Sequence, residues 1–304
     1  MEFRTPVSIS QAPFSIEPGQ RVFCVGSCFA NSIGQRFKDA LFPTTVNPYG
    51  VMYNPASILH TIQKAAEASK RPRTLAHSEP RTLAPSELHT LAPSELSPDI
   101  AILTLGTNHV YKLKETGEIV DNCQKRPASL FEELELGVDA CARYLEQAIA
   151  LLRRHNPQVN IILTVSPIRY QKYGFHGSQL SKATLLLAID SVVSSSEHDR
   201  ESTPTGVTSY FPTYEIMNDE LRDYRFYAPD MLHPSEQAVD YIWQRFVETY
   251  FSDKAKQYLR EWKPIRQALD HRPFDEQSAA YQTFQAQTQQ RLDDFKKRYG
   301  VYEG

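Results

Sequence analysis

Residues 22–37 read VFCVGSCFANSIGQRF, and this stretch decides the fold that we predict for the chain. It begins with four apolar residues, passes through Gly26 and Ser27, and continues with apolar residues spaced three and four apart. The first part is typical of a strand buried on both faces, and the last part is typical of a helix. Gly26 and Ser27 mark the turn between them. A strand that leads directly into a helix is the unit from which parallel α/β sheets are built.

Two further segments have the form of buried strands. Residues 100–105 (IAILTL) and 159–165 (VNIILTV) are short apolar runs, and each ends in small polar residues or proline. A fourth strand is predicted over residues 207–211. Helix-like stretches are predicted over 31–40, 55–68, 130–154, 181–194 and 235–250. Strands that alternate with helices in this way predict parallel βαβ units in an open α/β sheet.

The predicted sheet domain spans residues 1–251 and contains an insertion. Residues 73–96 repeat one octapeptide three times, as RTLAHSEP, RTLAPSEL and HTLAPSEL. Because proline restricts itself and the residue before it, we interpret this repeat as a solvent-exposed insertion or an ordered lid. Residues 252–304 form a polar helical appendage with Trp262, Ile265, Tyr281 and Phe284 at its apolar positions. It is expected to pack on the sheet domain or on a second subunit, which would make a homo-oligomer.

The composition excludes several classes of protein. The 304 residues include 33 Lys and Arg against 36 Asp and Glu, which gives a formal net charge of −3. Because binding to phosphates requires a clustered basic excess, we expect no nucleic-acid or membrane-surface partner. The chain lacks an apolar run of the roughly 18 residues that a membrane span requires. Its first residues, MEFRTPVSIS, do not resemble a secretory signal, so a cytoplasmic location is expected.

The four cysteines do not predict a metal site. Cys24, Cys28, Cys123 and Cys141 include no pair at the C-x-x-C spacing. Zinc sites need three or four converging ligands, so we expect reduced thiols and no bound metal.

Ligands of open parallel sheets bind beyond the carboxyl ends of the strands. Ser27 follows the first strand there, and it is interpreted either as a nucleophile or as the N-cap of the next helix. The segment Asp230-Met-Leu-His233 lies between Pro229 and Pro234, just before a helix. This spacing lets one short segment supply an imidazole, as proton acceptor for a serine, and the carboxylate that orients it.

Other residues near the strand ends have alternative interpretations. Cys28 is a rival nucleophile or a small buried apolar residue. His109 and His176 are candidates for lining the pocket. Arg169 is a clamp for a substrate carboxylate or phosphate, or a member of a structural ion pair. Lys182 is interpreted as the start of a helix, in a solvated or structural role.

The motif Gly26-Ser-Cys-Phe-Ala30 resembles that of the GSCFA family, which is similar to the SGNH, or GDSL-like, hydrolases. The resemblance covers about residues 1–250. Its other blocks follow in the family's order: NPYGVMYNP at 47–55, LGTNHVY at 105–111, TVSPIR at 164–169, HGSQLSK at 176–182 and DMLH at 230–233. It implies a three-layer, flavodoxin-like α/β fold.

The resemblance also implies roles for particular residues. Ser27 corresponds to the nucleophile, although the sequence reads Gly-Ser-Cys where better-known relatives read Gly-Asp-Ser. Gly50 and Asn108 correspond to donors of an oxyanion hole, together with the N–H of Ser27. Asp230 and His233 match the Asp-x-x-His block.

From these residues we expect a serine esterase without a cofactor. Its substrate is expected to be a small-molecule or glycan ester, and its mechanism a Ser-His-Asp acyl-enzyme route. Two alternatives remain: an O-acyltransferase that uses the same site, and a binding module without catalytic activity on the same fold.

Overall fold

The computed structural model describes residues 5–69, 97–121, 123, 126–199, 206–274 and 277–300. The predicted repeat at 73–96 lies outside the described residues. None of the helices in the described part of the chain combines the length and the apolar character that crossing a membrane requires.

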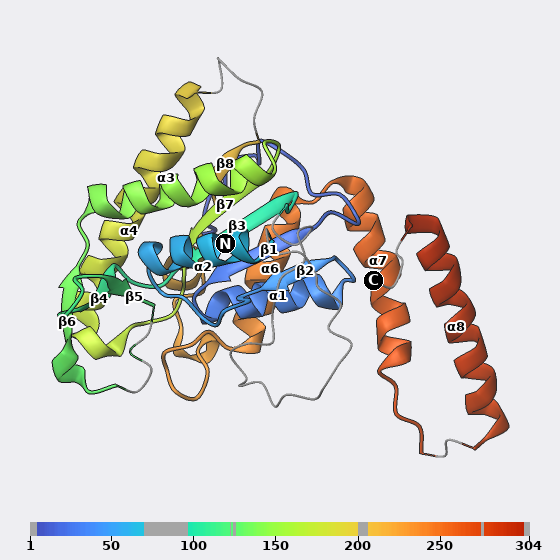
Figure 1. The fold of residues 1–304 in the computed structure, drawn as a ribbon. Helices are drawn as coiled ribbons and strands as arrows, with labels where there is room; N and C mark the ends of the chain where they lie inside the picture. The colour runs from blue at the N-terminus through green and yellow to red at the C-terminus, as the bar shows by residue number, and fades with distance from the viewer. Residues whose placement is uncertain are drawn as a thin grey trace, which may run out of the picture.

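The centre of the molecule is a five-stranded parallel sheet (Figure 1). Its strands run in the order β2-β1-β3-β7-β8, where the bounds are β1 (Val22–Gly26), β2 (Thr44–Val46), β3 (Ile100–Leu105), β7 (Asn160–Val165) and β8 (Thr208–Tyr210). Counted within the sheet, this is the order 2-1-3-4-5 of flavodoxin-like folds. The predicted fold class is therefore confirmed. The short, half-buried strand β2 was not predicted from the sequence.

Helices cover both faces of the sheet and make three layers. One face packs on α2 (Pro55–Ser69), α3 (Val138–His155) and α4 (Gly174–Asp199), and the other on α1 (Cys28–Asp39) and α6 (Glu236–Tyr250). Because neighbouring residues of a strand point to opposite faces, Phe23 and Val25 belong to the first core and Val22 and Cys24 to the second. The apolar runs of the sequence reflect this double burial.

A second, antiparallel sheet corrects one predicted helix. It has the order β5-β4-β6, with β4 (His109–Leu113), β5 (Ile119–Val120) and β6 (Phe131–Glu135). The helix predicted over 130–154 therefore begins only at Val138, with Gly137 at its N-cap. Pairing of β6 with β4 overrides the helix propensity of Leu and Glu in this segment.

Helix α4 also begins earlier than predicted, at Gly174 rather than at Ser181. Two glycines in its first turns, Gly174 and Gly177, are poor helix formers and hid this start. The remaining short elements are η2 (Ala128–Leu130), η3 (Gln171–Tyr173), α5 (Thr213–Glu215), the π-helical turn η4 (Ile216–Leu221) and η5 (Tyr224–Phe226).

The C-terminal helices are α7 (Asp253–Leu269) and α8 (Ala279–Tyr299). Helix α7 packs on the sheet domain at the end of α1, where the Tyr258 hydroxyl donates to the Ala40 carbonyl at 2.7 Å and the Trp262 indole donates to the Asp39 carbonyl at 2.6 Å. These bonds satisfy carbonyl groups that a helix C-terminus leaves without partners. Helix α8 lies beside α7, outside the sheet domain (Figure 1). Of the predicted apolar positions, Trp262 and Ile265 are buried.

Candidate active site

The turn between β1 and α1 requires glycine and presents a serine. Gly26 has a φ of +141°, and a Cβ at this position would lie 2.0 Å from the Thr104 carbonyl oxygen. Its N–H donates to Asn47 Oδ1 at 2.9 Å. Ser27 is the N-cap of α1, with Oγ accepting from the Phe29 N–H at 3.3 Å and paired with Thr104 Oγ1 at 3.2 Å. The N-cap role is therefore real, and it fixes the position of the hydroxyl.

Ser27 lines a cavity of about 350 Å³ beyond the carboxyl ends of β1, β3 and β7. Open α/β sheets bind their ligands at this edge. The cavity is lined by Ser27, Cys28, Tyr53, Gly106, Ser166, Ile168, Arg169, Tyr170, Gln171, Lys172, Lys182, Leu232 and His233. Segments distant along the chain thus meet here, including the predicted pair Ser27 and His233. No hydrogen bond joins Ser27 Oγ to His233 in the described structure.

Asp230 holds His233 as the sequence spacing predicted. His233 Nδ1 lies 2.5 Å from Asp230 Oδ2, and Asp230 Oδ1 accepts from the backbone N–H groups of Leu232 and His233 at 2.9 and 3.0 Å. The backbone N–H groups of His233 and Leu232, followed by the His233 ring, lower the pKa of Asp230 to about 2. Because the carboxylate is ionised, Nδ1 must donate the proton in this contact. In the neutral ring, Nε2 is then the nitrogen that can accept a proton.

Arg169 holds the segment that carries this pair. Its backbone N–H donates to the Leu232 carbonyl at 3.0 Å, and its guanidinium donates to the Met231 carbonyl at 3.0 Å. The guanidinium also lies over the Phe175 ring, 4.0 Å from its centroid. The predicted structural ion pair is absent among the described residues: carbonyl groups and aromatic rings surround Arg169 instead. Arg169 lines the cavity as expected, and its contacts position the 230–233 segment.

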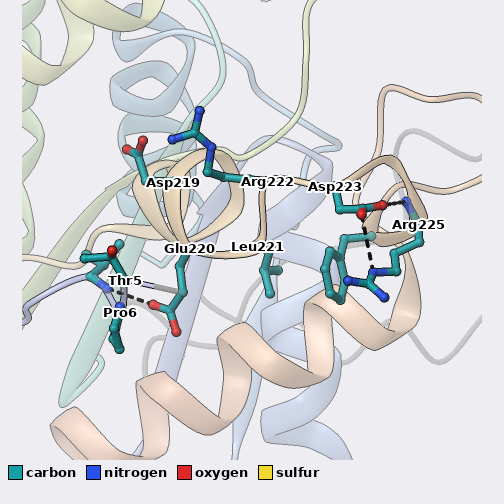
Figure 2. Close-up of a pocket in the computed structure, with 10 residues that line it drawn as sticks. Thr5, Pro6, Asp219, Glu220, Leu221, Arg222, Asp223 and Arg225 are labelled. Atoms are coloured by element: carbon teal, nitrogen blue, oxygen red, sulfur yellow. Dashed lines mark hydrogen bonds and ion pairs between the residues drawn. The ribbon is translucent and has the colours of Figure 1, made fainter. Parts of the chain in front are cut away.

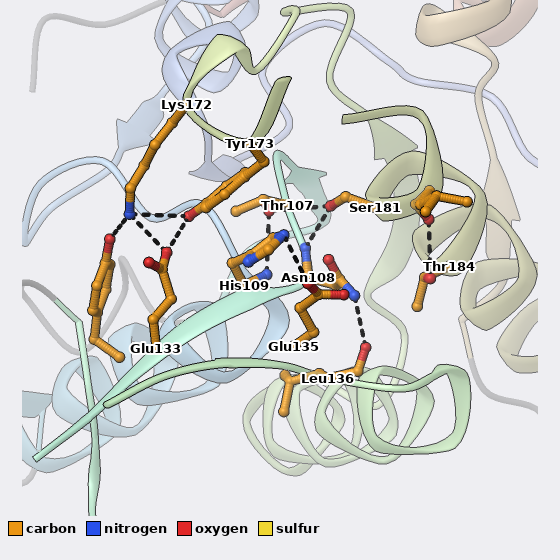
Figure 3. Close-up of polar contacts among 12 residues, drawn as sticks. Thr107, Asn108, His109, Glu133, Glu135, Leu136, Lys172, Tyr173, Ser181 and Thr184 are labelled. Carbon is orange, nitrogen blue, oxygen red and sulfur yellow. Dashed lines mark hydrogen bonds and ion pairs between the residues drawn. The ribbon is translucent and has the colours of Figure 1, made fainter. Parts of the chain in front are cut away.

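The three donors expected for an oxyanion hole already donate to carbonyl groups of the protein. The Ser27 N–H donates to Thr104 at 3.0 Å, the Gly50 N–H to Asn47 at 2.9 Å, and Asn108 Nδ2 to Leu136 at 2.8 Å (Figure 3). Neither Gly50 nor Asn108 lines the cavity. The reason at Gly50 is a tight turn, Asn47-Pro-Tyr-Gly50, closed by its own N–H. The structure therefore does not place these two residues in the wall of the Ser27 cavity.

The two histidines expected near the pocket lie outside its lining. His109 stacks on Tyr173 with ring centroids 3.5 Å apart, and its Nε2 lies 3.9 Å from Glu135 Oε1 (Figure 3). Burial is the main cause that lowers the pKa of His109. Tyr173 stacks in turn on Tyr170, which does line the cavity. His109 thus supports the wall from behind, and His176 is exposed on α4.

Lys182 lies inside the protein, beside the carboxyl ends of two strands. Its side chain is only 1% exposed, and its Nζ donates to the carbonyls of Gly106 at 2.7 Å and Ser166 at 2.9 Å. A solvated role for Lys182 is therefore wrong. The spacing of Ser178, Ser181 and Lys182 was the available signal, because residues at i, i+3 and i+4 share one helix face. Ser178 Oγ and Ser181 Oγ accept from the backbone N–H groups of Tyr170 and Asn108.

A larger cavity of about 880 Å³ lies elsewhere, between the N-terminal segment and the residues after α5 (Figure 2). It holds none of the predicted site residues. At its wall, Glu220 accepts from the Val7 N–H and pairs with Arg245 at 2.7 Å. This cluster ties the N-terminal segment to α6.

Comparison with solved structures found distant likenesses. An acetyl esterase mutant with acetate ion is 14% identical, with 81% of this chain and 99% of that chain covered and a TM-score of 0.34. A family 3 carbohydrate esterase from Talaromyces cellulolyticus is 13% identical, with 81% and 99% covered and a TM-score of 0.34. A family two carbohydrate esterase from Clostridium thermocellum, in complex with cellohexaose, is 12% identical, with 82% and 66% covered and a TM-score of 0.41. No curated protein matches the chain.

Family models match most of the sequence. A model described as the GSCFA domain protein, C-terminal domain, matches residues 262–301, which include the end of α7 and all of α8. The model of the GSCFA family matches residues 21–246, from the start of β1 into α6. This chain belongs to the GSCFA family.

Proposed function

We propose that this protein is a serine esterase that hydrolyses a small O-acyl ester, with Ser27 as nucleophile, His233 as base and Asp230 as its orienting acid. One observation carries the proposal. Ser27 and His233 come from opposite ends of the sheet domain, line one cavity, and His233 is oriented through Nδ1 by an ionised carboxylate. Contacts between nucleophile and base are often long before substrate binds, so the missing bond between them is compatible with the role.

The reaction follows from these positions. Ser27 Oγ attacks the ester carbonyl carbon, and its proton passes to His233 Nε2. When the bond between that carbon and the alcohol oxygen breaks, His233 returns the proton to the departing alcohol. A water molecule then gives a proton to His233 and attacks the acyl carbon. When the bond between that carbon and Ser27 Oγ breaks, His233 returns the proton to Oγ and the acid is released. Asp230 stabilises the imidazolium that forms twice in this cycle.

The cavity indicates the size and character of the substrate. A volume of about 350 Å³ is near the lower end for small-molecule sites and suits a short acyl group with part of its alcohol. The rings of Tyr53 and Tyr170 line it in an edge-to-face contact, with centroids 5.8 Å apart. Aromatic side chains in a cavity wall suit the apolar face of a sugar ring. We therefore propose an acylated sugar or a related metabolite as the substrate.

Labelling with a fluorophosphonate serine probe, followed by kinetics on short-chain nitrophenyl esters, tests the proposal. Ser27→Ala should abolish labelling and reduce kcat by a factor of about 10⁴ or more, as for other serine triads. Cys28→Ala is the matched control, because Cys28 lines the same cavity and its Sγ lies 3.5 Å from the Tyr53 hydroxyl. It should retain labelling. Near-normal turnover by Ser27→Ala would remove the assignment.

The same assay separates the two alternatives. If the acyl group appears on an added sugar acceptor, and free acid forms only without one, the protein is an O-acyltransferase. If neither labelling nor turnover occurs with the wild-type protein, a binding module replaces the esterase.

A further inference from the structure

Lys182 presents a buried positive charge to the cavity. An ammonium group has three N–H donors, and two of them reach the Gly106 and Ser166 carbonyls. No ion pair joins Lys182 to a carboxylate among the described residues, and no Asp or Glu lines the cavity. Among the described residues the hydrogen bonds of Nζ go to these two carbonyls, the Tyr214 ring lies 5.8 Å away, and the side chain lines the cavity. A buried charge without a counterion is costly, and such groups gather at functional sites.

Lys182 lies beside the proposed nucleophile. Gly106 joins the two, because its carbonyl accepts from Lys182 and a Cβ on Gly106 would lie 3.5 Å from Ser27 Cβ. The other cations of the cavity make different contacts. Lys172 pairs with Glu133 at 2.6 Å, and the Arg169 guanidinium donates one of its five N–H groups to Met231. Lys182 differs from both in its burial, with Nζ held between the Gly106 and Ser166 carbonyls.

We infer that the Lys182 ammonium stabilises the oxyanion that forms on the substrate carbonyl when Ser27 attacks it. This inference rests on the proposed esterase function and deepens it. It also supplies a donor where the expected ones are not found, since Gly50 and Asn108 are not among the lining residues and the Ser27 N–H donates to the Thr104 carbonyl. A fixed donor aimed at a developing negative charge, in a site shielded from water, contributes about 10²–10³-fold to the rate.

The test compares Lys182→Met with wild type on a neutral nitrophenyl ester. We expect kcat to fall about 10²–10³-fold with KM little changed, because the interaction exists only in the transition state. Inhibition by phenylboronic acid, whose serine adduct is a tetrahedral anion, should weaken by a similar factor. Lys64→Met is the control, since Lys64 pairs with Asp121 away from the cavity. It should leave both quantities unchanged.

The pH profile provides a readout that a structural role would not move. Burial lowers the pKa of Lys182 to about 7, so the ammonium is lost as pH rises through that value. Wild-type kcat/KM should therefore decline above pH 7, and Lys182→Met should lack this decline. The other titratable groups around the cavity are Cys28, Tyr53, Tyr170, Lys172 and His233, with the Tyr214 ring 5.8 Å from Nζ. Burial raises the pKa of Tyr53, Tyr170 and Tyr214, which moves their titration to higher pH.

The outcomes separate this inference from the esterase proposal. If Ser27→Ala inactivates the enzyme, but Lys182→Met keeps both the wild-type rate and the decline at high pH, the role of Lys182 alone is overturned. If kcat/KM of wild type rises with pH at low pH and that rise is lost in Lys182→Met, Lys182 acts as the base. That result would also overturn the inference. If Lys182→Met does not fold, the wild-type profile decides: constant kcat/KM from pH 7 to 9 refutes the inference. Absence of Ser27-dependent turnover in the wild type refutes both proposals.

Discussion

Gly26 shows how one residue sets the position of the proposed nucleophile. Replacement by alanine combines a positive φ with a Cβ only 2.0 Å from the Thr104 carbonyl oxygen. We expect Gly26→Ala to lower the free energy of unfolding by about 3 kcal/mol or more, the scale of combined strain and overpacking. Urea unfolding measures this loss.

Gly50→Ala is the matched control, because Gly50 also has a positive φ, +94°, but nothing lies within 4 Å of an added Cβ. Backbone strain alone should lower the free energy of unfolding of Gly50→Ala by about 1 kcal/mol. Equal losses in the two variants would show that the Thr104 contact is unimportant.

The sequence predicted the position of some candidate site residues correctly, and that of others wrongly, for a physical reason. Ser27, Asp230 and His233 lie in short motifs whose spacing alone suggests their chemistry, and the structure places Ser27 and His233 at one cavity. Asn108 donates to the Leu136 carbonyl, which belongs to another segment of the fold, whereas the Gly50 N–H closes its own turn onto Asn47. Family correspondence could not supply that information.

At the scale of elements, the conformation of the segment before α6 depends on contacts with Arg169. Met231 has a φ of +59°, an uncommon value for a residue with a side chain, and Arg169 bonds the carbonyls of Met231 and Leu232. We expect Arg169→Met to lower kcat about tenfold, as loss of a charge-assisted hydrogen bond suggests, and to leave KM unchanged. Steady-state kinetics on a neutral ester checks this.

Arg225→Met is the control for this change, because Arg225 is exposed, pairs with Asp223 and lies outside the Ser27 cavity. Arg225→Met should have the same kcat and KM as wild type. A rise in KM confined to esters that carry a negative charge, with kcat intact, would instead assign Arg169 to substrate binding.

Helix α4 illustrates why element boundaries affect functional interpretation. With a start at Ser181, Lys182 would lie in the first turn of a helix, where exposure is common. The observed start at Gly174 puts Lys182 more than two turns inside, on the face that packs against the sheet edge. The predicted strands at 100–105 and 159–165 were nearly correct, because double burial gives a strong local signal, whereas a glycine-rich helix start gives a weak one.

At the scale of the whole molecule, the parallel sheet order and its three layers follow from local patterns that the sequence displays. The antiparallel sheet does not, because β4 and β6 are separated along the chain and their pairing is a non-local choice. The candidate site combines the ends of the parallel strands with the helices that cover them. The parallel strands bring Ser27, Gly106 and Ser166 to one edge, and the helices on either face supply Lys182 and position His233.

The burial of Lys182 has a consequence for the stability of the whole protein. The pKa of Lys182 is about 7 in the folded state, below the ordinary lysine value of 10.5 that the unfolded chain has. Between these values the unfolded state binds more protons, so the free energy of unfolding rises with pH, by at most about 1.4 kcal/mol per pH unit from this group. Below pH 7 both states are protonated, and the destabilisation is complete and constant.

Lys182→Met removes this group and leaves the other titrations in place. The free energy of unfolding of wild type, minus that of Lys182→Met, should therefore increase steadily from pH 7 to pH 9 and stay constant between pH 5 and pH 6. Urea unfolding of both proteins at each pH measures the difference. A difference that does not change from pH 7 to pH 9 would mean that Lys182 keeps its ordinary pKa in the folded protein, and the expected decline of activity above pH 7 would then have no physical basis.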